Sequence, residues 1–177
     1  FVNRDGTVFG EDQMNQVAAL KPRGGEVFHA LWNHVGRLTR YDFSDQYVEA
    51  VLNWIDREKI MRTKLLVVTD AGGGATYQTT PTMLSRSGCG VLTLNSTPGD
   101  FKRRIEPVPE VLSDLKATVK EVDASFGVAH DCDGDRAVFV NETGDVLSED
   151  LPIAVALDHY LDRTKTPLVV NSASSQV

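Results

Sequence analysis

The sequence has few of the residues that mark several large classes of protein. Only two of its 177 residues are cysteine, Cys89 and Cys132, which is too few for a disulfide framework. We expect both thiols to be reduced, as in a cytoplasmic protein. No apolar run approaches the roughly 18 residues that a membrane span needs, and no basic-then-apolar signal peptide opens the sequence. These absences exclude a disulfide scaffold and a membrane partner.

Positive charge is also scarce. The 18 Lys and Arg residues oppose 25 Asp and Glu residues, which gives a net charge of −7. Proteins that bind nucleic acid in general need a basic face for the phosphates, so the balance argues against a nucleic-acid partner. Hydrophobic residues make up 41% of the sequence. The length and this fraction predict a packed core in one domain, or one domain plus fragments.

Strand and helix patterns alternate through the middle of the sequence. Apolar runs predict strands at 64–69, 90–94, 124–130, 136–140 and 167–170. Apolar residues at helical spacing, with capping residues, predict helices at 41–60, 80–88, 109–122 and 148–162. Such alternation is typical of a layered α/β domain, which we expect to run from about 42 to 166. Residues 1–41 are irregular by comparison.

Three aspartates crowd into the loop between two of these strands. Asp131, Asp133 and Asp135 alternate around Gly134, and Arg136 follows directly. At about 4 Å, each pair of like charges costs roughly 1 kcal/mol in water and about 4 kcal/mol at an effective dielectric near 20. A hard divalent cation with oxygen ligands would offset this repulsion. The three aspartates are therefore candidate metal ligands.

Three other readings of this loop have to be weighed. A plain acidic turn is one, because Asp-Gly is an ordinary turn pair, although a turn does not need three carboxylates facing one point. A calcium EF-hand is rejected, because its sixth position needs Gly and holds Arg136 here. An aspartyl phosphotransferase of the haloacid-dehalogenase type stays a minor alternative. Its motif usually ends in Thr or Val, and it needs downstream groups for which only 41 residues are left.

The segment DCDGDR (131–136) resembles the magnesium loop of the α-D-phosphohexomutases, which are phosphoglucomutases, phosphomannomutases and phosphoglucosamine mutases. VVTDAGGGA (67–75) is similar to the strand and Gly-rich turn at the start of the family's second domain. LSRSGCGVLTLNSTPGDFKRRIEPVPEVLSDL (84–115) and DASFGVAHDCDGDRAVFVNETGDVLSED (123–150) resemble the segments around the metal loop. The departures are GGG for a common GNG, PGDF for a usual D-G-x-F, and Cys132 for a frequent Gly. These departures bear on the subfamily and not on the family, since no metal-ligand carboxylate is lost.

The resemblance implies a fold and a domain organisation. It implies a layered α/β/α domain with a mixed sheet, as in phosphohexomutase domain 2, for residues 42–166. Residues 1–41 would then be the C-terminal part of domain 1, and residues 167–177 the start of domain 3. The family's catalytic serine lies in a T-A-S-H-N-P type segment, which this sequence lacks. We therefore expect a piece of a longer enzyme, with no catalytic residue of its own and no activity alone.

The resemblance also implies an activity. Family enzymes move a phosphoryl group between the 1 and 6 positions of a hexose, through a phosphoserine and a hexose 1,6-bisphosphate. Mg²⁺ would be bound by Asp131, Asp133, Asp135 and a phosphoserine oxygen. Arg136 would contact the phosphoryl oxygens, with a structural ion pair to the aspartates as its alternative. The expected partners are the hexose phosphate, the bisphosphate and the remaining domains, while the preferred hexose is undetermined.

Some interpretations stay open at this point. The whole chain could be a non-catalytic module of the same fold that binds a sugar phosphate or a protein partner. The Gly-rich segment 70–74 could cradle a phosphate through its backbone N–H groups, although a tight strand-to-helix turn is favoured. His130, next to the aspartates, could support the metal site or be an ordinary structural histidine.

Overall fold

The computed structural model describes residues 1–20, 29–161 and 167. The chain forms two compact units, Phe1–Tyr41 and Asp42–Val177. Residues 168–170, most of the last predicted strand, lie outside the described residues. Among the described residues, no helix is long and apolar enough to span a bilayer.

The first unit contains helix α1 (Glu11–Ala19), one turn of 3₁₀-helix (Trp32–His34) and a small antiparallel bridge between Val2 and Val8. None of its described residues, 1–20 and 29–41, is buried. Trp32, for example, is 89% exposed. The apolar core of the described structure therefore belongs entirely to the second unit.

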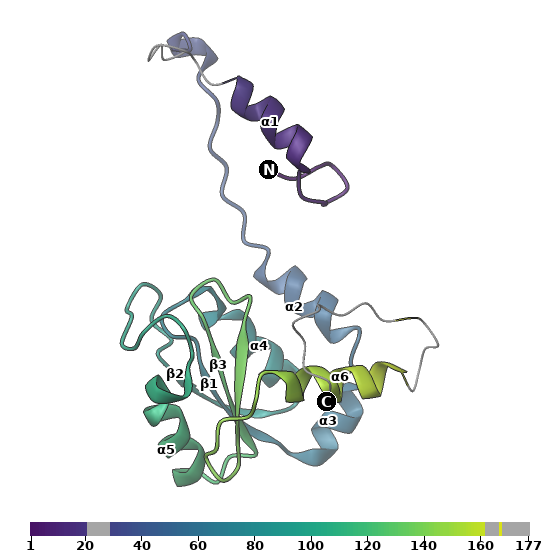
Figure 1. The fold of residues 1–177 in the computed structure, drawn as a ribbon, viewed down its shortest axis with the longest axis vertical. Helices are drawn as coiled ribbons and strands as arrows, with labels where there is room; N and C mark the ends of the chain where they lie inside the picture. The colour runs from purple at the N-terminus through teal and green to yellow at the C-terminus, as the bar shows by residue number, and fades with distance from the viewer. Residues whose placement is uncertain (21–28, 162–166, 168–177) are drawn as a thin grey trace. The chain divides into compact units, whose positions relative to one another are not determined.

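The second unit is built on a mixed sheet of four strands, shown in Figure 1. The strand order is β2-β1-β3-β4, and the strands are β1 (Leu66–Asp70), β2 (Gly90–Leu94), β3 (Phe126–His130) and β4 (Ala137–Asn141). Strand β1 pairs in parallel with both β2 and β3, whereas β4 runs antiparallel to β3. A parallel strand in the middle of a sheet is covered on both faces, so residues that point to either face are buried. Val67 and Val68 of β1 are accordingly fully buried.

Helices cover both faces of this sheet. The second unit contains α2 (Ser44–Leu52), α3 (Arg57–Thr63), α4 (Thr79–Arg86), α5 (Ser113–Glu121) and α6 (Asp150–Leu161). Leu115 and Val119 of α5 pack in the main core with Val68 and Val140. Helix α4 lies beside Val91 and Thr93, which point to the opposite face. Figure 1 shows α5 and α4 on the two sides of the strands. The predicted α/β/α layering with a mixed sheet is confirmed.

One glycine allows α5 to pack this closely. A Cβ on Gly127 of β3 would lie 2.9 Å from Leu115 Cδ1 and 2.8 Å from Val119 Cγ2. Real side chains essentially never approach so closely, because carbon atoms in contact are about 3.5–4.0 Å apart. Gly127 therefore sets the spacing between β3 and the helix that covers it.

The single helix predicted at 41–60 is wrong, as is the expectation that residues 1–41 are irregular, since α1 lies there. The structure has two helices at 41–60, α2 ending at Leu52 and α3 beginning at Arg57. Asp56 starts the second one, because its carboxylate accepts a hydrogen bond from the backbone N–H of Lys59 at 3.0 Å. Such an N-cap satisfies one of the free donors at a helix start. The apolar spacing continued through the break and concealed it.

Candidate functional site

The candidate site lies where two neighbouring strands end. Strands β1 and β3 are parallel, and Asp70 at the end of β1 pairs in register with Ala129 of β3. Asp131 follows β3 directly. Ligands of open α/β sheets bind outside the carboxyl ends of the strands, so the predicted aspartate loop is on the functional edge of this sheet.

The aspartate loop, residues 131–136, is folded around the carboxylate of Asp131. This side chain is buried, and its Oδ1 accepts hydrogen bonds from the backbone N–H groups of Gly134 at 3.1 Å and Arg136 at 3.2 Å. Gly134 has a φ of +80°, and a Cβ at this position would collide with the side chain of Thr76. Glycine is therefore required both for the turn and for the space.

The turn brings the three predicted ligands together. One carboxylate oxygen from each of Asp131, Asp133 and Asp135 lies within 4.8 Å of the other two. Asp131 is buried, while the other two are exposed. An octahedral Mg²⁺ at 2.0–2.1 Å needs ligand oxygens about 3 Å apart when adjacent and about 4 Å apart when opposite. The triad fits such an ion, since the two exposed side chains are free to close the remaining gap.

Two members of the triad have pKa values shifted in opposite directions. Burial acts to raise the pKa of Asp131, but hydrogen bonds from the side chain and backbone of Arg136 outweigh it and lower this pKa to about 2. The pKa of Asp135 is raised by its hydrogen bond with Asp131 and by the negative charges of Asp133 and Asp131. Neighbouring carboxylates resist joint ionisation in this way. A divalent cation would relieve this repulsion.

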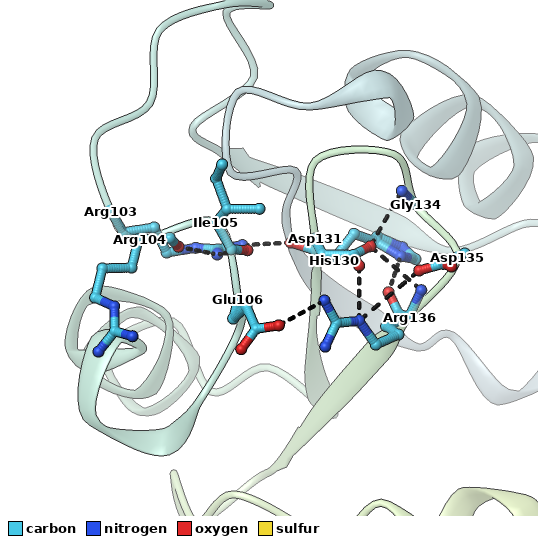
Figure 2. A network of polar contacts seen from close by, with 9 residues as sticks. All are labelled: Arg103, Arg104, Ile105, Glu106, His130, Asp131, Gly134, Asp135 and Arg136. Carbon is cyan, nitrogen blue, oxygen red and sulfur yellow. Dashed lines mark hydrogen bonds and ion pairs between the residues drawn. The ribbon is translucent and has the colours of Figure 1, made fainter.

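Arg136 forms an ion pair with Asp131, which is the structural role predicted as the alternative to phosphate binding. Its Nε donates to Asp131 Oδ2 at 2.8 Å, and its terminal Nη2 donates to Glu106 Oε1 at 2.9 Å (Figure 2). The side chain is still 53% exposed. It also lines a hollow of about 470 Å³, together with Glu106 and Phe139. The guanidinium is thus fixed on one side and open on the other, which suits an anion-binding group.

Asp131 keeps some capacity for a further ligand. A carboxylate offers about four lone-pair positions. The two backbone N–H groups occupy Oδ1, and the Nε of Arg136 occupies one position on Oδ2. The remaining position is the one available for the hydrogen bond with Asp135. A cation can replace the proton of that hydrogen bond, so the ion pair with Arg136 and metal binding are compatible.

The Gly-rich segment 70–74 forms a tight turn and not a phosphate cradle. Its three glycine N–H groups are already paired: Gly72 with Asp70 Oδ1, Gly73 with the Asn95 carbonyl and Gly74 with the Ala71 carbonyl, each at 2.8 Å. A phosphate would have no free donors there. The cradle interpretation is therefore wrong, because these donors stabilise the turn itself.

The same turn supports the aspartate loop by direct backbone contact. The N–H of Ala75 donates to the carbonyl of Cys132 at 2.8 Å. A Cβ on Gly74 would lie only 2.5 Å from that carbonyl oxygen. The absence of a side chain at this position lets the two loops touch.

His130 is a structural histidine with both ring nitrogens engaged. Its Nδ1 lies 3.1 Å from the carbonyl oxygen of Arg136, and its Nε2 lies 3.2 Å from the Thr80 hydroxyl. A carbonyl only accepts, so Nδ1 carries the proton and Nε2 accepts from Thr80. Burial lowers the pKa of His130, which favours this neutral form. The ring thereby ties β3 to α4 and to the end of the aspartate loop.

One buried ion pair was not expected from the sequence. Asp70 is 1% exposed, and its Oδ2 accepts from the Nε of Arg103 at 2.9 Å. The Arg103 side chain is 7% exposed. Its sequence context, FKRR, gave no sign that one of two adjacent arginines is buried. The sequence signal that could have indicated this ion pair is Asp70 itself, a charged residue at the end of a buried strand that needs a partner.

The fold and the site together define a class: an α/β/α domain with an acidic loop, suited to a divalent cation, at the carboxyl edge of a mixed sheet. Residues 45–144 match the family described as phosphoglucomutase/phosphomannomutase, alpha/beta/alpha domain II. The chain belongs to this family, as the sequence resemblance indicated.

Relatives agree with this assignment. The chain is 38% identical to a phosphoglucomutase/phosphomannomutase of Thermococcus kodakarensis, over 85% of this chain and 34% of the relative. It is 33% identical to a probable phosphoglucosamine mutase of Methanopyrus kandleri, over 100% of this chain and 39% of the relative. A solved phosphoglucomutase/phosphomannomutase family protein from Burkholderia thailandensis superposes with a TM-score of 0.62 at 31% identity, covering 70% of this chain and 27% of that one. The chain thus spans about a third of the length of the curated relatives that it matches.

Proposed function

We propose that this chain supplies the metal-binding domain of a Mg²⁺-dependent phosphohexomutase. The complete protein would interconvert hexose 1-phosphate and hexose 6-phosphate through a phosphoserine and a hexose 1,6-bisphosphate. The observation that carries this proposal is the convergence of Asp131, Asp133 and Asp135 within the segment that matches the family. The names of the relatives support a mutase, and the donor set supports a hard cation.

The three ligands would have different tasks. Asp131 is held rigidly by two backbone N–H groups and one guanidinium, so it would fix the position of the ion. Asp133 and Asp135 are exposed and would close around it. Bound Mg²⁺ would withdraw charge from the phosphoryl group being transferred. Three carboxylates leave coordination positions for water and for a phosphate oxygen.

Arg136 would bind the same phosphoryl group from its exposed side. Its inner side is engaged by Asp131 and Glu106, which removes much of the freedom that an unpaired arginine would lose on binding. A charge-assisted hydrogen bond from a pre-oriented guanidinium is stronger than a neutral one. Arg136 is therefore proposed as a phosphate-binding residue as well as an ion-pair partner.

The remaining parts of the active site would come from other domains. We propose that residues 1–41 end domain 1, that residues 42–166 are domain 2 and that residues 167–177 begin domain 3. The serine segment of the family is not in this sequence. The chain alone should therefore not turn over hexose phosphates, and the hexose phosphate and bisphosphate would bind with the remaining domains in place.

Metal binding can be tested on the chain as it is. Binding to the folded state stabilises by RT ln(1 + [L]/Kd), which is about 1.4 kcal/mol at ten times Kd. Millimolar Mg²⁺ should therefore raise the melting temperature by a few degrees, as measured by calorimetry. Asp133→Ala should abolish the rise, whereas Glu121→Ala, which removes an exposed carboxylate from the end of α5, should preserve it. An equal rise in both variants would remove the loop as the metal site.

Activity requires the complete protein that carries this chain. Conversion of glucose, mannose and glucosamine 1-phosphates should depend on Mg²⁺ and on the bisphosphate activator. Asp133→Ala should lose most of the activity, and Glu121→Ala should not. No conversion of any of the three sugars, together with tight sugar-phosphate binding, would favour a non-catalytic module of the same fold.

A further inference from the structure

A buried arginine, Arg103, lies behind the aspartate loop, and every nitrogen of its guanidinium has a partner. Figure 2 shows its contacts with His130, Arg104 and Ile105. The Nε of Arg103 donates to Asp70 Oδ2 at 2.9 Å. One terminal nitrogen donates to the carbonyl of His130 at 2.7 Å and lies 3.5 Å from that of Asp70. The other donates to the carbonyls of Arg104 at 3.0 Å and Ile105 at 3.2 Å.

The partners of Arg103 come from three segments that are far apart in the sequence. Asp70 ends β1, the His130 carbonyl ends β3, and residues 104–105 belong to the loop that leads to α5. The carbonyl of His130 is part of the peptide group that joins His130 to Asp131. Arg103 thus holds the peptide bond from which the first of the three aspartates projects.

The geometry requires a guanidinium. Arginine presents a rigid planar fork of donors, so one side chain can bind a carboxylate and a carbonyl at once. The ammonium group of lysine is a compact point charge with strong hydration. It would keep the charge beside Asp70, but it has no fork to hold the His130 carbonyl in the same plane.

We propose that Arg103 is a positioning residue for the metal site, acting through the peptide group of His130 and Asp131. The inference rests on the proposed function, since it assumes that Asp131 binds the cation. Groups behind the ligands of a metal site orient those ligands, and their loss typically costs about 10–100-fold in affinity. Arg103 has this place behind Asp131, because it holds the carbonyl of the residue directly before it.

If Arg103 only stabilised the fold, its loss would lower the melting temperature and leave the metal affinity unchanged. A positioning role can therefore be distinguished from a structural one. Arg103→Lys keeps the positive charge beside Asp70 and removes the fork. The matched control is Arg86→Lys, which disturbs the ion pairs of Arg86 with Asp45 and Glu49, at 2.6 and 3.0 Å between α4 and α2. Those ion pairs are made by side chains that belong neither to the aspartate loop nor to the partners of Arg103. Both variants should melt at lower temperature than the parent chain.

The deciding measurement is the dissociation constant of Mn²⁺, with water-proton relaxation as the readout and Mg²⁺ as competitor. Manganese shares the carboxylate preference of magnesium. Arg103→Lys should weaken Mn²⁺ binding at least about tenfold, while Arg86→Lys should leave it unchanged. Equal affinity in Arg103→Lys and the parent chain would overturn the positioning role and leave the metal site itself standing. If Asp133→Ala bound Mn²⁺ as tightly as the parent chain, the loop would not be the metal site, and this inference would fall as well.

A second variant covers the case in which Arg103→Lys does not fold. Asp70→Asn combined with Arg103→Gln removes both buried charges together, so that neither is left unpaired. The His130 carbonyl still loses its guanidinium donor, so Mn²⁺ binding should weaken at least about tenfold here too. Parent-like affinity in this folded double variant would count against the proposal.

Discussion

Asp70 and Asp131 lie at the same edge of the sheet and accept almost the same hydrogen bonds, but the arginines that bind them differ in exposure to solvent. Asp70 accepts from the Gly72 N–H at 2.8 Å on Oδ1 and from the Arg103 Nε at 2.9 Å on Oδ2. Asp131 accepts from the Gly134 N–H at 3.1 Å on Oδ1 and from the Arg136 Nε at 2.8 Å on Oδ2. Both carboxylates are almost fully buried.

The difference lies in the arginines. The Arg103 side chain is 7% exposed, and all its other donors bind backbone carbonyls. The Arg136 side chain is 53% exposed and has two further acidic residues near it, Glu106 and Asp135. The same type of carboxylate–guanidinium pair is therefore found in two settings. The Asp70–Arg103 pair at the end of β1 is buried, and we call it the closed pair. The Asp131–Arg136 pair at the end of β3 is reached by water through its arginine, and we call it the open pair.

The largest expected effect comes from breaking the closed pair. Arg103→Met would leave Asp70 buried without its cation, and removing one partner of a buried pair costs about 3–5 kcal/mol. The equivalent change at the open pair, Arg136→Met, should cost much less, because water reaches that guanidinium. Urea unfolding of the two variants measures both losses. Equal losses would mean that exposure does not distinguish the two pairs.

The next effect concerns the contact between the two loops. Gly74→Ala would put a Cβ 2.5 Å from the Cys132 carbonyl oxygen, and backbone on both sides limits the adjustment. Overpacking of this kind costs about 1–3 kcal/mol. Gly36→Ala is the control, because no atom lies within 4 Å of its added Cβ. Thermal unfolding should show a loss for Gly74→Ala alone; a loss of the same size in both would contradict the crowding argument.

A smaller effect is expected where His130 is anchored. Thr80→Val removes the hydroxyl that donates to His130 Nε2 and keeps a side chain of similar shape. One such hydrogen bond contributes about 0.5–1.5 kcal/mol. Urea unfolding measures the loss, and the tautomer of His130 can be read from its ring ¹⁵N shifts. A ring protonated on Nε2 in the parent chain would show that the hydrogen bond runs the other way.

The smallest effect should follow from Glu106→Gln. This change removes the charge that pairs with the terminal Nη2 of Arg136, at 2.9 Å, where both side chains are about half exposed. Exposed ion pairs contribute little and are screened by salt. The urea midpoint should barely move, and any shift at low salt should vanish at about 1 M salt. A large loss of stability that is independent of salt would show that the Glu106–Arg136 contact behaves like the buried Asp70–Arg103 pair.

Local features of the sequence predicted most of the elements. The strands at 90–94, 124–130 and 136–140 and the helix at 80–88 match β2, β3, β4 and α4 to within two residues. Buried strands and capped helices carry their signal within a few neighbouring residues. The helix break at residues 53–56 was missed, because the apolar spacing runs through it.

The sequence by itself determined the acidic loop, since three alternate aspartates around a glycine can face one point wherever the loop is placed. It also determined the family, through motifs that span the loop and its flanking strands. Only the tertiary structure decided which charges are buried. Arg103 and Arg104 are neighbours in the sequence, but Arg103 alone reaches back to Asp70 and His130. That choice depends on the parallel pairing of β1 and β3, which brings Asp70 and His130 together from positions sixty residues apart. No local pattern encodes a contact between segments so distant in the chain.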